Sequence, residues 1–198
     1  MNFFDILPLI KAIGLSGIFI FVFAESGLFF GFFLPGDSLL FTAGVLAAAG
    51  YFNIMFLFLG CFFFAVLGDS VGYWFGQKTG PKIFSRPNSF FWNQKNLEKT
   101  AVFFKKYGDK TITLARFTPI VRTFAPIMAG VGKMEYKVFL FWNVLGALFW
   151  SGLMIFGGYF LGNSIKDIDK IILPIVLLII LASLAPVFWQ LIRRGKEK

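Results

Sequence analysis

Long apolar stretches separated by short polar segments dominate the chain, and their lengths predict helices in a membrane. A helix needs about 20 mainly apolar residues to cross the hydrocarbon core of a bilayer. The stretches at 53–77, 138–161 and 171–192 reach that length, so we expect three full spanning helices. The third contains Pro174 near its start and Pro186 in its interior, and we expect a kink at Pro186.

A fourth apolar stretch, residues 13–50, is interrupted and does not have the form of a simple spanning helix. Pro35, Gly36 and Asp37 break it, and the arm at 38–50 is then about 20 Å long at about 1.5 Å per residue. That arm is too short to span a bilayer. Irregular backbone at membrane depth is tolerated where it is buried in protein or lines a wet cavity, which favours a re-entrant hairpin over an ordinary kinked helix.

A second broken stretch covers residues 111–132. It is divided by Pro119 and Pro126, and it contains Arg116 and Arg122. The same reasoning predicts a second re-entrant hairpin, with two kinked helices as the alternative reading of both stretches.

The distribution of basic residues predicts the topology. They are concentrated in the loop at 78–110 and at the C-terminus, and the positive-inside rule places both regions in the cytoplasm. The first hairpin then enters from outside and the second from the cytoplasm, an inverted repeat of a kind that recurs in transporters. We therefore predict a single all-α polytopic membrane domain over residues 1–198, with these parts: hairpin and span at 1–77, basic cytoplasmic loop at 78–110, hairpin and span at 111–162, and a final span at 171–192.

Composition supports a membrane protein and excludes several other classes. Of 198 residues, 58% are hydrophobic and 20% aromatic, beyond the usual apolar share of a soluble domain. The formal charge of +9 does not predict a nucleic-acid partner, because the basic residues lie in loops beside apolar spans rather than in a nucleic-acid-binding motif. The chain has no histidine, and its single cysteine, Cys61, lies in an apolar run, so we expect no metal site and no cofactor.

Charged residues within the apolar stretches are the candidates for function. Each costs roughly 2.5–3.5 kcal/mol at the centre of a membrane helix, so such residues usually mark a substrate or ion pathway. We expect them to be paired, hydrated or both. They are Glu25, Asp37, Asp69, Arg116 and Arg122.

The two arginines favour binding of an anion. Arginine offers a planar fork of donors that matches phosphate, so Arg116 and Arg122 on either side of Pro119 are predicted to hold one phosphate group. The alternative is that each arginine neutralises a carboxylate of the other hairpin, and the two arrangements can alternate during a transport cycle.

The carboxylates are candidates for coupling to protons. Glu25 and Asp37 lie on opposite sides of the Pro35 break, and a turn there would bring them to one cavity. Desolvation favours the protonated acid whereas a neighbouring arginine favours the carboxylate, so an anion that reaches the arginines would favour protonation of the acids. Fixed counter-ions are the alternative. Asp69, between two glycines, is either a third proton site or a packed polar residue.

Three motifs resemble the DedA family of bacterial membrane proteins, within the VTT/SNARE-associated domain superfamily. They read ESGLFFGFFLPGD at 25–37, GDSVGY at 68–73 and ARFTPIVRTFAPIMAG at 115–130. The resemblance covers nearly the whole chain. It implies two opposed re-entrant hairpins, and the family's acidic and arginine pairs match Glu25 with Asp37 and Arg116 with Arg122.

The resemblance also implies a function. Family members are linked to the return of undecaprenyl phosphate across the cytoplasmic membrane, often with dependence on the proton gradient. Others are associated with phosphatidylethanolamine transport, resistance to envelope stress and cationic peptides, or oxyanion uptake. We therefore expect a proton-coupled lipid-phosphate flippase in a bacterial cytoplasmic membrane, with the lipid, protons and the bilayer as its partners and a homo-oligomer compatible with the sequence.

Several further functions are compatible with the sequence. Undecaprenyl pyrophosphate phosphatases also place glutamate and arginine on re-entrant segments, so a hydrolase is one alternative function. The absence of histidine removes the usual acid–base partner of histidine-dependent lipid phosphatases, so we expect no enzymatic activity. A scramblase for phospholipids such as phosphatidylethanolamine, a non-transporting membrane organiser and an exchanger of small anions for protons are further alternatives.

Overall fold

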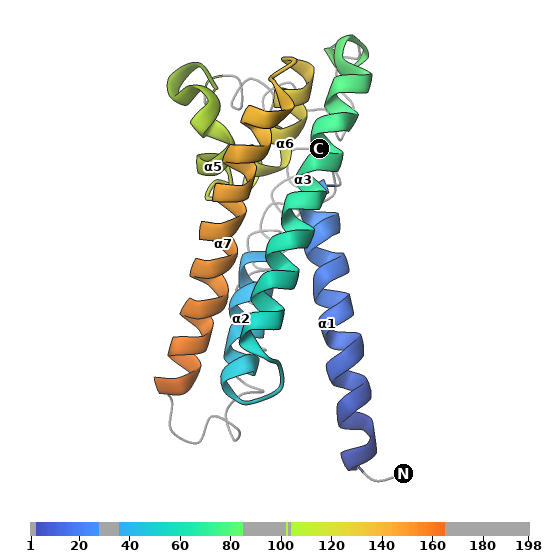
Figure 1. The fold of residues 1–198 in the computed structure, drawn as a ribbon, viewed down its shortest axis with the longest axis vertical. Coiled ribbons are helices and arrows are strands. Elements are labelled where there is room, and N and C mark those ends of the chain that lie inside the picture. Colours follow the sequence, from blue (N-terminus) through green and yellow to red (C-terminus); the bar gives the residue numbers. More distant parts are fainter. Residues whose placement is uncertain (1–2, 28–35, 85–101, 103, 165–198) are drawn as a thin grey trace, which may run out of the picture. The chain divides into compact units, whose positions relative to one another are not determined.

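The computed structural model describes residues 3–27, 36–84, 102 and 104–164, and these ranges are helical with short connections (Figure 1). Within them no strand occurs, which confirms the all-α prediction. The helices are α1 (Phe3–Gly27), α2 (Gly36–Ala48), α3 (Ile54–Phe84), the 3-10 helix η2 (Gly108–Lys110), α5 (Thr111–Ala115), α6 (Pro119–Val131) and α7 (Tyr136–Ser164).

Two of these helices are long and apolar enough to cross a membrane. They cover Ile54–Thr79 in α3 and Tyr136–Ser164 in α7, which matches the spans expected at 53–77 and 138–161. In their most apolar segments only 33% and 39% of the residues are buried, so most of this apolar surface is not used in the protein core. The third expected span, 171–192, lies outside the described residues, and the re-entrant course of the two broken stretches stays a prediction.

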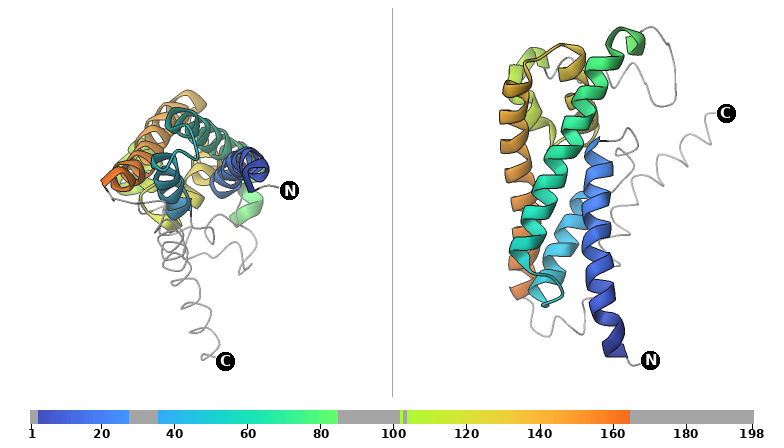
Figure 2. Two further views of the ribbon diagram at one scale, coloured as in Figure 1. Left: turned by 90° about the horizontal axis from the view of Figure 1, so that it is seen from below. Right: turned by 45° about the vertical axis from the view of Figure 1, so that its right-hand side comes forward.

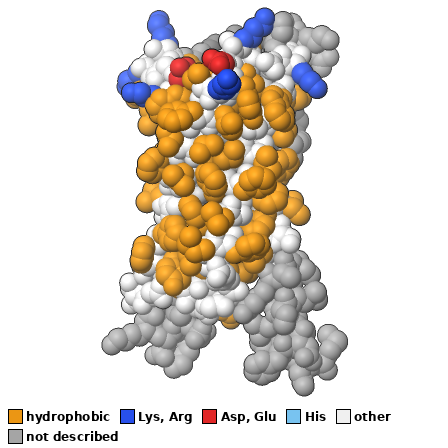
Figure 3. Space-filling model, viewed as in Figure 1, with side chains coloured by type: hydrophobic (Ala, Val, Ile, Leu, Met, Phe, Trp, Pro, Cys, Tyr) orange, Lys and Arg blue, Asp and Glu red, His pale blue; other side chains and the backbone are white. Residues whose placement is uncertain are grey.

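Large apolar side chains project outward from both long helices. Figure 3 shows hydrophobic side chains over most of the face in view, with charged side chains gathered at its top. Apolar surface of this extent would be an aggregation liability in water, whereas lipid tails cover it at no cost. The largest exposed examples include Phe56, Phe63 and Trp74 on α3 and Phe141, Phe149 and Phe160 on α7.

A side-chain cap fixes the start of α3. The Asn53 Oδ1 accepts hydrogen bonds from the backbone N–H groups of Met55 and Phe56, both at 3.0 Å. These amides belong to the first turn of the helix and have no partner within it, so the cap supplies one.

Asn53→Ala is expected to lower the free energy of unfolding by about 1 kcal/mol, the usual cost of losing such a cap. Asn53→Asp should retain most of it, because aspartate caps equally well. Thermal unfolding followed by circular dichroism in dodecyl maltoside measures the change, with Asn163→Ala, at an exposed position near the end of α7, as the control. Equal melting temperatures for Asn53→Ala and wild type would contradict the prediction.

The chain divides into two compact units, and α1, α3 and α7 each contribute a segment to both. The first unit contains Met1–Ile18, Pro35–Leu59 and Gly152–Lys198, and the second contains Phe19–Leu34 and Gly60–Ser151. The predicted single membrane domain and its inverted repeat stay predictions.

In the first unit, α2 packs against the C-terminal part of α7 through glycines. A Cβ atom at Gly44 would collide with the backbone of Ile155, and one at Gly158 would collide with the backbone of Phe41. Small residues at these positions let the two backbones touch, which is the usual means of helix association in a membrane.

In the second unit, α3 and α7 run antiparallel and α6 packs on α3 (Figure 2). The Tyr73 ring stacks on the Phe139 ring with centroids 4.6 Å apart. A Cβ atom at Gly76 would collide with the backbone of Ile127, and one at Gly130 with that of Tyr73. The close approach of α6 to α3 places the residues of α6 against the C-terminal end of the span predicted at 53–77.

The break at Pro119 is confirmed. Helix α5 ends at Ala115, and α6 begins at Pro119. Between them Thr118 is extended, with φ −125° and ψ 107°, as expected for a residue that precedes proline. In the other broken stretch, α2 begins at Gly36, while Pro35 lies outside the described residues.

The prediction that Pro126 breaks the second stretch is wrong, because Pro126 lies inside α6. Proline has no N–H to donate to the carbonyl of Arg122 four residues earlier, which ordinarily weakens a helix. Packing maintains the helix here. Pro126 and its neighbours Phe124, Ala125 and Ile127 are buried, and the Cβ position of Gly72 on α3 lies 3.5 Å from the Pro126 Cβ.

Candidate functional site

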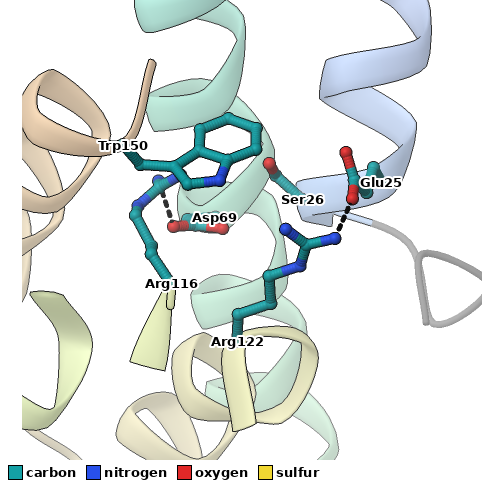
Figure 4. A pocket seen from close by; sticks show the side chains of 6 residues that line it. All are labelled: Glu25, Ser26, Asp69, Arg116, Arg122 and Trp150. Carbon is teal, nitrogen blue, oxygen red and sulfur yellow. Dashed lines mark hydrogen bonds and ion pairs between the residues drawn. The ribbon is translucent and has the colours of Figure 1, made fainter. Parts of the chain in front are cut away.

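Four of the five charged residues predicted from the sequence meet at one small pocket of the second unit (Figure 4). The pocket is built where the end of α1, the middle of α3, the end of α5, the first turn of α6 and the middle of α7 converge. Its lining residues are Glu25, Ser26, Asp69, Arg116, Arg122 and Trp150.

One ion pair joins α6 to α1. An Arg122 NH2 group donates a hydrogen bond to the Glu25 Oε1, and only 13% of the Arg122 side chain and 2% of the Glu25 side chain are exposed. Glu25 lies in the last turn of α1, and Arg122 lies in the first turn of α6. Both partners therefore stand at helix ends that border the two breaks predicted from the sequence.

A second ion pair joins the end of α5 to α3. The Arg116 NH2 group lies 2.5 Å from the Asp69 Oδ2, and it also lies 2.8 Å from the Asn143 Oδ1. Exposed fractions are 5% for the Arg116 side chain and 7% for the Asp69 side chain. Gly146 makes room for this arginine, because a Cβ atom there would lie 3.0 Å from the Arg116 Cδ.

Trp150 lies against both arginines. The guanidinium carbons of Arg116 and Arg122 are each 5.7 Å from the centroid of its ring. At this separation an indole attracts a cation through its electron-rich face, and the attraction is largest where water is excluded. Only 2% of Trp150 is exposed, so the ring forms a buried surface shared by the two guanidinium groups.

The pocket is small and has no net formal charge. Its cavity volume is about 10 Å³, which is room for about one water molecule and not for a phosphate group. Two guanidinium groups face two carboxylates, so the charges cancel. The arrangement in which arginines neutralise carboxylates is the one that this structure shows, although the partner of Arg116 comes from a span and not from the other hairpin.

Asp37, the fifth predicted residue, is not among the residues that line this pocket. It lies in the first turn of α2, where the helix dipole favours an acidic side chain, and it belongs to the first unit. The prediction that Asp37 and Glu25 share a cavity therefore stays a prediction.

Sequence reasoning missed Asn143 and Trp150. Asn143 is fully buried in α7, and it interrupts an otherwise apolar predicted span. Polar side chains in spanning helices usually face the interior of a bundle, and a residue seven positions along lies on the same face. The seven-residue spacing of Asn143 and Trp150 could therefore have indicated that both side chains face the interior of the helix bundle. Ser26, beside Glu25 in the sequence, was also missed.

A polar network ties Asn143 to α3. The Asn143 Nδ2 donates a hydrogen bond to the Val66 carbonyl at 3.1 Å, and the Ser70 Oγ donates to the same oxygen at 2.8 Å. The Tyr136 hydroxyl lies 3.3 Å from the Ser70 Oγ. A backbone carbonyl accepts hydrogen bonds and has no proton to pass on, so this chain of contacts fixes positions and is not a proton relay.

Carboxylates are the only metal-ligating groups at the pocket, and the part of the chain that the structure describes contains no group of three His, Cys, Asp or Glu residues that could hold a metal ion. Asp69 and Glu25 are each engaged with a guanidinium. The arrangement presents two buried arginines, each paired with a carboxylate of the same pocket.

Comparison with known proteins places the chain in a family. Residues 34–160 match the VTT domain. The chain is 44% identical to Protein DedA of Escherichia coli K12, over 90% of this chain and 82% of that protein. It is 41% identical to an uncharacterized membrane protein of Mycobacterium leprae over 86% of this chain and 78% of the relative, and 31% identical to Inner membrane protein YqjA of E. coli K12 over 87% and 83%. No solved structure matches the chain.

Proposed function

The chain belongs to the DedA family of VTT-domain membrane proteins, and from that premise we propose that it is a flippase that carries undecaprenyl phosphate across the bacterial cytoplasmic membrane. The family is linked to membrane transport or lipid function. The cytoplasmic membrane is supported by the relative described as an inner membrane protein. The cytoplasmic position of the C-terminus rests on the loop charges of the sequence.

The observation that supports a phosphate substrate is the buried pair of arginines beside Trp150. A phosphate group accepts two parallel hydrogen bonds from a guanidinium as a carboxylate does, so it can replace a carboxylate at Arg122 or Arg116 without loss of geometry. In this structure the carboxylates of Glu25 and Asp69 hold the positions on the two guanidinium groups that the phosphate would take.

Coupling to protons follows from the balance of charge. The four ionised groups of the pocket cancel, so an added phosphate charge would leave an uncompensated anion at membrane depth. Protonation of one displaced carboxylate restores the balance. We propose that the carboxylates of this chain carry protons in the direction of the phosphate, with Glu25 and Asp69 at the pocket and Asp37 as a further predicted site.

We propose transport without hydrolysis. Ser26 is the hydroxyl at the pocket, and a nucleophilic serine needs a general base in hydrogen-bond reach. The nearby carboxylates of Glu25 and Asp69 are each bound to a guanidinium, which opposes their acceptance of a proton from serine. The phosphate group is therefore expected to leave as it entered.

Arg122→Ala is expected to reduce the transfer of undecaprenyl phosphate across a bilayer by about 100-fold, because each charge-assisted pair to phosphate is worth about 1.5–3 kcal/mol and the variant also leaves Glu25 buried without its counter-ion. Proteoliposomes that contain labelled undecaprenyl phosphate and an inside-to-outside pH gradient measure the transfer, and free phosphate is assayed in parallel.

The matched control is Lys137→Ala, which also removes one cation but at an exposed position of α7. It should transport at the wild-type rate. Release of free phosphate by wild type would establish a hydrolase instead. Transfer no faster than in empty liposomes would reject this lipid, and phosphatidylethanolamine or a small anion then becomes the substrate to test.

A further inference from the structure

We propose that the two ion pairs have different roles: Arg122 and Glu25 separate to admit phosphate, whereas Arg116, Asp69 and Asn143 stay bound together as a fixed support. This inference rests on the proposed function and refines it, because it assigns the exchangeable charge to one arginine and not to both.

The surroundings of Arg116 oppose its release. Its NH2 group faces acceptors from two helices, Asp69 on α3 and Asn143 on α7. The Ala65 carbonyl is a third acceptor, 3.4 Å from the same group. Asn143 is itself bound to the Val66 carbonyl, so it cannot follow a moving arginine. Separation would leave the Asp69 carboxylate buried without its counter-ion and would remove the arginine donor from the Asn143 Oδ1, which is strongly unfavourable.

The backbone that carries Arg116 is also tied down. Thr113, one turn earlier on α5, donates its hydroxyl to the Trp142 carbonyl of α7 at 2.6 Å. A Cβ atom at Gly146 of α7 would lie 3.0 Å from the Thr113 Cα, so the two helices are in direct backbone contact. Arg116 is therefore anchored at both its backbone and its guanidinium.

The Arg122–Glu25 pair is placed differently. Its residues lie at the end of α1 and the start of α6, whereas Asp69 lies at the middle of the long helix α3 and Asn143 lies two turns inside α7. Helix ends change their course by rotation of a few backbone bonds, whereas the interior of a long helix moves as a rigid rod. The side chain of Arg122 is also the more exposed of the two arginines, 13% against 5%.

The exchange moves one charge and one proton. The phosphate oxygen takes the place of the Glu25 carboxylate on Arg122, and Glu25 takes a proton from water on the side from which the phosphate enters. When phosphate leaves, Glu25 returns that proton to water and binds Arg122 again. The charged groups that face Glu25 are Arg122 from α6 and, across the pocket, Arg116 and Asp69, which cancel each other.

Trp150 supports the exchange. Because its ring lies 5.7 Å from the guanidinium carbon of Arg122, it keeps a contact with that cation while the carboxylate is replaced. The same ring lies against Arg116, so the phosphate on Arg122 remains beside a second positive charge.

The test compares removal of each carboxylate charge. Purified protein in dodecyl maltoside is titrated with farnesyl phosphate, a short isoprenyl phosphate, by isothermal calorimetry. Glu25→Gln removes the competitor of phosphate at Arg122, so its Kd should fall about tenfold. Asp69→Asn should tighten binding clearly less than Glu25→Gln, because the Arg116 guanidinium keeps the Asn143 Oδ1 as an acceptor and does not turn to the phosphate.

Equal tightening by Asp69→Asn and Glu25→Gln would overturn the division of roles and leave the proposed function standing. No saturable binding of farnesyl phosphate by wild type or by Glu25→Gln would overturn the proposed function, and the division of roles with it.

A second measurement does not depend on the folding of the Asp69 variant. Titrations at one pH in two buffers with different ionisation enthalpies give the number of protons taken up on binding. Wild type should take up about one proton more than Glu25→Gln, and the ionisation of the ligand cancels in this difference. Equal proton uptake by wild type and Glu25→Gln would overturn the assignment of the exchange to Glu25.

Discussion

Asp69→Leu will lower the free energy of unfolding by about 3–5 kcal/mol, because it leaves a guanidinium buried without its carboxylate. The side chain of Arg116 is only 5% exposed, so bulk water cannot replace the lost counter-ion. Asn143 remains as an acceptor but carries no charge. Unfolding by sodium dodecyl sulfate in mixed micelles, followed by circular dichroism, measures the loss.

The double variant Arg116→Met with Asp69→Leu should recover most of this stability. Replacement of a whole buried ion pair by apolar residues of similar size is often neutral, because no charge remains to be desolvated. Asp109→Leu, at an exposed acidic position of η2, is the control and should change stability by less than about 0.5 kcal/mol. A double variant as unstable as the sum of its two single variants would show that the residues are not coupled.

Gly130→Leu will lower stability by about 3 kcal/mol and transport by about 100-fold, because it forces α6 away from α3. A Cβ atom at Gly130 would collide with the Tyr73 carbonyl and would lie 2.8 Å from the Gln77 nitrogen. These are backbone atoms of a long helix, and they cannot move aside as the end of a flexible side chain can. Since α6 also carries Arg122, the displacement reaches the pocket.

Gly17→Leu is the matched control, since a Cβ atom at Gly17 would meet no atom of the described residues within 4 Å. Glycine in a helix interior is unfavourable by about 1 kcal/mol, so this substitution should leave stability unchanged or raise it slightly. The same unfolding and proteoliposome assays apply to both variants. Wild-type transport by Gly130→Leu would mean that the contact between α6 and α3 does not position the site.

The helices were largely predictable because their signals are local. Long apolar runs identified the membrane-length segments of α3 and α7 to within a few residues, and the proline at 119 marked the start of α6. Pro126 was misjudged because its effect depends on what packs around it: proline weakens a helix, and burial against Gly72 and its neighbours keeps this one continuous.

The charged candidate residues were predictable as well, but the way they pair was not. Charge is costly at membrane depth, and this alone selected the four charged residues of the pocket. Their pairing depends on contacts between distant segments: Arg122 meets Glu25 across 97 positions, and Arg116 meets Asp69 across 47. Trp150 is part of the site only because it lies on the face of α7 that contacts the two arginines, which the sequence alone does not reveal.

By itself, then, the sequence determined an all-helical membrane protein with buried charges and a break at Pro119, because hydrophobic length, backbone restriction by proline and the cost of burying charge are properties of single segments. The tertiary structure decided which carboxylate neutralises which arginine and how little room remains between them. Those outcomes depend on how closely the helices approach, and the glycines at 68, 76 and 130 set that distance only once the helices are packed together.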